Sequence, residues 1–198
     1  MKKMLVSAAL AATVLVPSAA AAQALPAAVI AVVDVQTVTN DCNACKIAAA
    51  ALRSQITGLQ NREKALAAPL ETEAKSLQAA ADALNGKEPD AALQARAKAF
   101  QTKQQSAQTE LARQQQQIAR NQQYVNKQIA DKLNPIFQQV MVRRGANILI
   151  EQGSTLATAK TVDVTSDVLA ALNAALPSIA TTAPAAPAQP KQEQPQGR

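Results

Sequence analysis

The chain has 198 residues, a formal net charge of +6, 17% charged residues and 2% aromatic residues. It has no His and no Trp, so the commonest general base and metal ligand is missing, and no glycine-rich phosphate loop or Gly-x-Ser-x-Gly elbow is present. We therefore expect neither an enzyme nor a bound cofactor or metal, and the scarcity of aromatic residues argues against a large compact core.

Residues 1–22 have the pattern of a secretory signal peptide. Lys2 and Lys3 precede an apolar run that ends near Val16, and small residues at 20–22 form an Ala-x-Ala cleavage site. The apolar run is too short for a permanent membrane helix. We predict that the mature chain is exported, which argues against nucleic acid as a partner.

Residues 23–43 are predicted to hold the first strand of a small body domain. Residues 28–35 form an unbroken, β-branched run that suits a strand buried on both faces. Nothing next to this run in the sequence can cover it. We therefore expect its partners to come from the C-terminal part of the chain and from other subunits.

Cys42 and Cys45 follow this strand in a Cys-x-x-Cys pattern, with Asn40 or Asp41 as the expected helix N-cap. In an oxidising compartment we predict a local or intersubunit disulfide, or plain packing. The same spacing is also typical of thiol oxidoreductases, and pooled cysteines of several subunits could bind a metal, so these alternatives stay open.

Residues 44–144 carry a seam pattern that predicts two long helices folded back on each other, with arms at about 44–84 and 91–144. The second arm places polar residues at seam positions, namely Gln104, Gln114 and Asn121. We therefore expect the two arms to pack loosely against each other. At about 1.5 Å per residue the arms reach roughly 60 Å. The hairpin is therefore expected to project from the body.

Local signals mark the turns and bends of this hairpin. Asn85-Gly86 is expected to end the first arm in left-handed backbone, and Pro89 to lie in the first turn of the second. Gly145 is the expected C-cap of the second arm. Pro69 and Pro135 lie within the arms and are each expected to kink a helix.

The hairpin region is basic, with 15 Lys and Arg against 8 Asp and Glu in residues 44–144. A field of this sign attracts acidic partners. The candidate electrostatic contacts lie near the predicted tip; they are Lys75, Lys87, Arg96, Lys98 and Lys103. The alternative is that these are ordinary solvated lysines and arginines.

Residues 145–177 are predicted to complete the body domain. Residues 146–150 and 155–160 are expected to be strands joined by a hairpin turn at 151–154. Thr165-Ser166-Asp167 is the expected N-cap cluster of a short helix that Pro177 ends. The candidate body or subunit-interface core consists of apolar strand residues: Val29, Ile30, Val32, Val33, Ile148 and Ile150. Residues 178–198 are rich in Ala, Pro and Gln and are predicted to be a disordered tail.

The order of these segments resembles the Skp/OmpH family of periplasmic chaperones. The resemblance rests on residues 30–34, the basic helical hairpin, residues 146–150 and residues 162–169, and it covers about residues 28–177. The predicted fold class is α+β, mostly α, with a long antiparallel coiled-coil hairpin projecting from a small β body. The resemblance implies that the body is completed by trimerisation.

The resemblance further implies an ATP-independent periplasmic holdase that binds unfolded outer-membrane proteins in a cavity between the arms. Contact with anionic membrane lipid or lipopolysaccharide stays open. One alternative is an exported coiled-coil structural or adaptor protein of the cell envelope. Another is a thiol oxidoreductase that uses Cys42 and Cys45.

Overall fold

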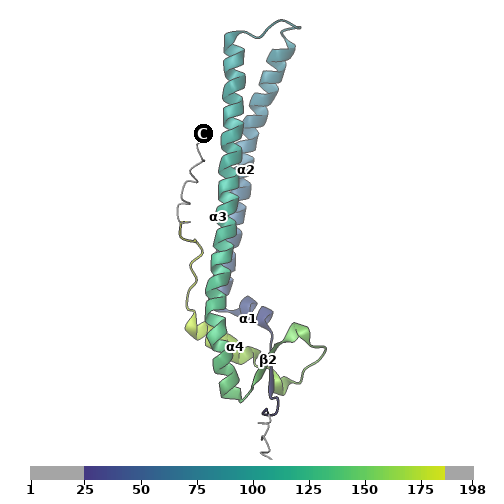
Figure 1. Cartoon of the computed structure of the whole chain (residues 1–198). Coiled ribbons are helices and arrows are strands. Elements are labelled where there is room, and N and C mark those ends of the chain that lie inside the picture. The colour runs from purple at the N-terminus through teal and green to yellow at the C-terminus, as the bar shows by residue number, and fades with distance from the viewer. Residues whose placement is uncertain (1–24, 186–198) are drawn as a thin grey trace, which may run out of the picture.

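The computed structural model describes residues 25–185, so the predicted signal peptide lies outside the described residues, as does the tail beyond residue 185. Two long helices rise from a small body made of both ends of the described chain (Figure 1). The predicted fold class, α+β and mostly α with a projecting helical hairpin, is confirmed. The elements in chain order are β1 (Ile30–Val33), α1 (Val35–Asp41), α2 (Asn43–Asp82), α3 (Ala91–Arg144), β2 (Ile148–Glu151), two 3-10 turns (Gln152–Ser154 and Lys160–Val162) and α4 (Thr165–Ala175).

The arms of the hairpin are α2 and α3. Asn85 and Gly86 have φ angles of 47° and 84°, the left-handed backbone that the sequence predicts for the turn. Asp90 caps α3, since its Oδ1 accepts a 2.8 Å hydrogen bond from the N–H of Leu93. Pro89 therefore precedes the helix and does not lie in its first turn. Helix α3 ends at Gly145, whose φ of 65° is the predicted C-cap conformation.

Both proline-containing arms are continuous helices. Helix α2 runs through Pro69, and α3 runs through Pro135. Each proline removes one helical hydrogen bond, but neither breaks its helix.

The body contains a parallel two-stranded sheet within the described residues. Ile30 pairs with Ile148, and the register continues to Val33 and Glu151. On the other edge of β1, the N–H of Val164 donates a 2.8 Å hydrogen bond to the carbonyl of Val32. Strand β1 is therefore paired on both sides, whereas among residues 25–185 β2 pairs on one side only.

The prediction of a strand at 155–160 and a hairpin turn at 151–154 is wrong. Residues 152–154 form a 3-10 turn. The Glu151 carboxylate accepts a hydrogen bond from the N–H of Gly153, and the N–H of Thr155 donates one to the Gln152 carbonyl. Residues 155–159 then have no regular structure, and Leu156 is fully exposed. A hairpin would have paired residues 155–160 with β2, but the chain leaves that edge through the 3-10 turn, and residues 163–164 pair with the other edge of β1 instead.

Helix α1 replaces the end of the predicted first strand. The Asp34 carboxylate accepts hydrogen bonds from the Thr37 N–H at 2.8 Å and from the Thr37 hydroxyl at 2.6 Å, and these bonds hold the pKa of Asp34 below its ordinary value. The predicted strand 28–35 therefore stops at Val33, and a helix begins two residues later. The side chain of Val38 is fully buried in the core, so this face of α1 packs against it.

The core lies where α4 and the base of α3 cover β1 and α1. Its most completely buried residues include Leu172, Val38, Val140 and Val168. The Thr165 hydroxyl accepts a 2.9 Å hydrogen bond from the N–H of Asp34, which ties α4 to the end of β1. The expected side-chain N-cap is not Thr165, Ser166 or Asp167; Asp163 accepts from the N–H of Thr165 instead.

The predicted body-core residues divide into two groups. Val32 and Val33 are buried in the chain itself, and Ile150 is half-buried. Val29, Ile30 and Ile148 are 48%, 43% and 40% exposed; Ile30 and Ile148 are paired at the start of the sheet and Val29 precedes β1, so apolar side chains are exposed at this end of the sheet.

The prediction that the tail is disordered from residue 178 is wrong for residues 178–185. Ile179 packs on the body core, and residues 180–183 lie along the hairpin (Figure 1). Few apolar side chains are available here, so the sequence alone indicates disorder. The segment is held instead by hydrogen bonds from its main chain.

We expect Leu172→Ala to lower the free energy of unfolding by about 2–5 kcal/mol, because it leaves a cavity in a fully buried site. Urea unfolding followed by far-UV circular dichroism measures this. Leu156→Ala is the matched control, since Leu156 is fully exposed and should change stability little. Equal effects of the two variants would contradict the position of the core.

Candidate binding surface of the helical hairpin

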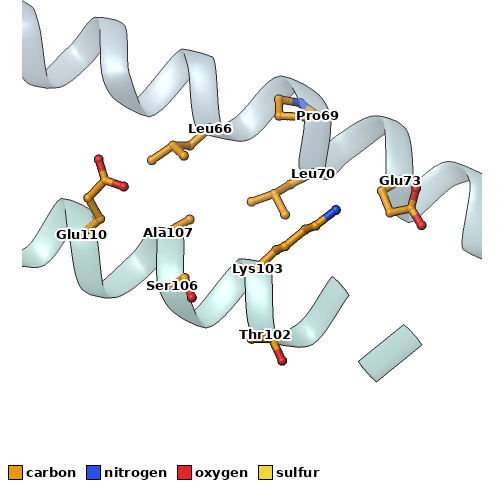
Figure 2. Close-up of a pocket in the computed structure, with 9 residues that line it drawn as sticks. All are labelled: Leu66, Pro69, Leu70, Glu73, Thr102, Lys103, Ser106, Ala107 and Glu110. Atoms are coloured by element: carbon orange, nitrogen blue, oxygen red, sulfur yellow. The ribbon is translucent and has the colours of Figure 1, made fainter. Parts of the chain in front are cut away.

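A proximal groove of about 320 Å³ lies between α2 and α3 at the level of Pro69. Figure 2 shows Leu66 and Leu70 projecting from α2 toward Ala107 of α3. The groove lining is largely apolar and consists of Leu66, Pro69, Leu70, Glu73, Thr102, Lys103, Ser106, Ala107 and Glu110. The groove exists because the large side chains of α2 face small ones on α3, which leaves the seam incompletely filled.

A distal groove of about 480 Å³ lies nearer the tip. Phe100, one of two phenylalanines in the chain, contributes to it from α3. The lining residues are Ala74, Leu77, Gln78, Ala81, Pro89, Leu93, Gln94, Ala97 and Phe100. The two grooves together expose apolar surface along the outer half of the arms.

The five cations proposed from the sequence are not equivalent, and of these five Lys103 alone is among the described residues that line the two grooves. Lys75 pairs with Glu71 at 2.6 Å, and Arg96 binds Glu73 and Ser76, each at 3.0 Å. In the described part of the chain, the other three have no ion pair; they are Lys87, Lys98 and Lys103. Lys103 extends across the proximal groove toward α2 (Figure 2).

The basic excess of residues 44–144 is distributed unevenly along the arms. Residues 71–103 contain five Lys and Arg and five Asp and Glu, so the tip region is balanced. The rest of residues 44–144 carries ten Lys and Arg against three Asp and Glu. The basic excess therefore lies nearer the body, and counting charges by segment would have revealed it.

Besides Arg96–Glu73, a second ion pair among the described residues joins the two arms, at the end of the proximal groove nearer the body. Arg62 of α2 binds Glu110 of α3 through two hydrogen bonds of 2.7 and 3.1 Å. The hydrogen bond from Arg62 is the main reason that the pKa of Glu110 lies below its ordinary value of 4.5. The same pairing raises the pKa of Arg62.

The polar seam contains a buried amide that the sequence places at a seam position. Asn121 is only 4% exposed, and its Nδ2 donates a 2.8 Å hydrogen bond to Oε1 of Gln55 on α2. Gln117 donates to Oδ1 of Asn121, also at 2.8 Å. This part of the seam is held by hydrogen bonds, as the polar second arm suggests.

Cys42 and Cys45 form a disulfide at the start of α2, with their Cα atoms 5.1 Å apart. Cys42 is the N-cap, and its sulfur accepts from the N–H of Cys45; neither Asn40 nor Asp41 caps α2. Both cysteines are buried in the body core, so their sulfur atoms are shielded from a protein substrate. Among residues 25–185, no cluster of three metal-ligating side chains occurs.

Residues 29–172 match the family described as "Outer membrane protein (OmpH-like)". The chain belongs to the OmpH-like family. A crystal structure of an OmpH-like protein from Caulobacter crescentus CB15, described as a candidate outer membrane chaperone, superposes with a TM-score of 0.65 and 20% identity, over 79% of this chain and 90% of that chain. At this identity the likeness shows a shared fold. No curated protein sequence matches the chain.

Within the described part of this OmpH-like chain, no helix has the length and apolarity needed to cross a membrane.

We expect Glu110→Gln to lower stability above pH 4.5 and to have less effect in more acidic solution. The folded-state pKa of Glu110 is depressed, so its stabilising effect is present above the unfolded pKa and is lost as pH falls through the folded pKa. Urea midpoints between pH 2 and pH 7 measure this. Glu63→Gln is the control, because Glu63 is exposed and has no ion pair among the described residues. A difference in urea midpoint between the wild type and Glu110→Gln that stays constant from pH 2 to pH 7 would contradict the link between Glu110 ionisation and stability.

Proposed function

We propose that this protein is an ATP-independent holdase chaperone of the periplasm. It binds unfolded outer-membrane proteins between its helical arms and keeps them soluble until they are assembled. A chaperone of the OmpH type is the role that its family supports. The observation that carries the proposal is the open apolar seam of a projecting hairpin, lined in part by Lys103, which has no ion pair in the described chain.

The form of this surface suits a client that must remain unfolded. The grooves are shallow, and the chain contributes few aromatic side chains of the kind that dominate tight interfaces. Many weak apolar contacts hold a chain without fixing one conformation. Lys87, Lys98 and Lys103 add a long-range attraction for acidic segments. Binding of this kind needs no nucleotide.

The proposal includes a homotrimer in which several hairpins surround one client. Val29, Ile30 and Ile148 form an exposed apolar patch on the body, and the outer edge of β2 is unpaired in the described chain. An unpaired strand edge beside apolar side chains favours association with another subunit. Light scattering of the mature protein gives its mass: three times the chain mass supports the trimer, and a well-folded single chain at micromolar concentration overturns it.

An anionic membrane lipid or lipopolysaccharide is a further proposed partner. The motivation is the basic excess on the part of the arms nearer the body. Vesicle co-sedimentation with anionic and zwitterionic lipids tests this, and equal binding to both would remove the electrostatic basis.

An aggregation assay separates the holdase from an exported structural or adaptor protein. An outer-membrane β-barrel protein denatured in urea is diluted into buffer with or without the mature chain, and light scattering is followed. We expect suppression near a stoichiometric ratio of trimer to client. A spacer or adaptor has no need to bind an unfolded client, so continued aggregation at excess chaperone would refute the proposal.

We expect client affinity to fall as salt rises from low to moderate ionic strength, because exposed charges contribute to encounter and binding. The variant Lys87→Glu/Lys98→Glu/Lys103→Glu should bind more weakly and show a smaller salt dependence. Fluorescence anisotropy with a labelled, urea-denatured client measures both. Lys160→Glu, an exposed change in the body, is the control. A flat salt response of the wild type would show that the lysines do not contribute.

A further inference from the structure

A short segment after α4 is bound along the hairpin by hydrogen bonds to its main chain. Gln128 pairs with both main-chain groups of Ala180: its Nε2 donates to the carbonyl at 2.9 Å, and its Oε1 accepts from the N–H at 3.0 Å. Gln55 donates to the carbonyl of Thr181 at 3.1 Å. Asn121 accepts from the N–H of Ala183 at 2.8 Å.

The spacing of these contacts requires an extended segment. Asn121 and Gln128 are seven residues apart on α3, so they lie on one face about 10.5 Å apart along the helix axis. Ala180 and Ala183 are three residues apart and span at most about 10–11 Å when fully extended. Two turns of helix therefore match three residues of extended chain. Gln114, half-buried, lies one further step of seven residues toward the tip.

The recognition does not depend on the side chains of the bound segment. All four hydrogen bonds join side-chain amides of the arms to backbone N–H or C=O groups. Gln128 satisfies both groups of a single residue, as a neighbouring β-strand would. Any extended polypeptide without proline at the two donor positions offers the same groups.

We propose that Gln55, Asn121 and Gln128 form a backbone-recognition row that binds extended segments of unfolded client polypeptides, and that residues 180–183 occupy this row in the absence of client. The inference rests on the proposed function and names a site on the arms where clients are bound. The tail is tethered to the same chain and competes at high effective concentration. A client must therefore displace it.

This row adds a neutral, sequence-independent contact to the apolar grooves and the lysines. Amide hydrogen bonds carry no net charge, so their strength changes little with salt. The salt response therefore separates the row from the lysine contacts nearer the tip.

The first test releases the tail in the full mature chain. Ala180→Pro/Ala183→Pro removes the two N–H donors and leaves the row intact. Fluorescence anisotropy with a labelled, urea-denatured β-barrel protein should show at least about threefold tighter binding than the wild type. Unchanged or weaker binding would show that the segment only braces the hairpin, and the inference would fall.

The second test changes the row in this released variant. Gln128→Ala should weaken client binding by about fivefold at both low and moderate salt, because two hydrogen bonds to each bound segment are lost. Gln123→Ala is the matched control, an exposed glutamine on the same helix with no hydrogen bond to the tail. Equal affinities of these two variants would refute the row.

A peptide experiment separates this inference from the proposed function. The labelled octapeptide Ser-Ile-Ala-Thr-Thr-Ala-Pro-Ala, the sequence of residues 178–185, is added to the released variant. We expect binding that survives replacement of its first and second alanines, which correspond to Ala180 and Ala183, by serine and is lost when both are N-methylated. This pattern without client binding would support the row and refute the holdase. Client binding without this pattern of peptide binding would support the holdase and refute the row.

Discussion

The structure depends on the unequal packing of two long helices. Helix α2 presents leucines to the seam, whereas α3 presents small or polar residues at several facing positions, such as Ala107 and Asn121. Such a seam cannot be filled by apolar contacts alone. It is closed in places by hydrogen bonds and by the Arg62–Glu110 ion pair, and elsewhere it is left open as grooves. The arms are thus held together and remain available for further contacts.

The body provides the anchor that such arms require. Its core, around Leu172 and Val140, joins β1, α1, α4 and the base of α3. The disulfide between Cys42 and Cys45 fixes the start of α2 in this core. The body also leaves apolar residues and one strand edge exposed, so the elements that hold the hairpin also offer a surface for assembly. Anchoring and association therefore share one small sheet.

Three kinds of contact are distributed along the hairpin. Apolar grooves and the lysines without an ion pair among the described residues lie toward the tip, and neutral amides that bind main chain lie nearer the body. Each contact is weak in water, since the grooves are shallow and hydrogen bonds exchange with solvent. A long, extended client meets several such contacts at once and need not adopt one structure. The arrangement favours retention of a mobile chain over selection of a sequence.

The sequence by itself determined the local features: the seam of the hairpin, the left-handed turn at Asn85 and Gly86, and the cap at Gly145. These depend on periodicity and on backbone preferences of residues close in sequence. The tertiary structure decided the loss of the strand at 155–160, the start of α1 at Val35 and the ordered segment 178–185. In place of that strand, residues 163–164 pair with the edge of β1, and the ordered segment depends on Gln128 meeting Ala180 across 52 residues. Helix α1 follows from the Asp34 cap together with burial of Val38 in a core supplied by α3 and α4. Such pairings join segments that are far apart in the sequence, so the local preferences of neighbouring residues cannot predict them.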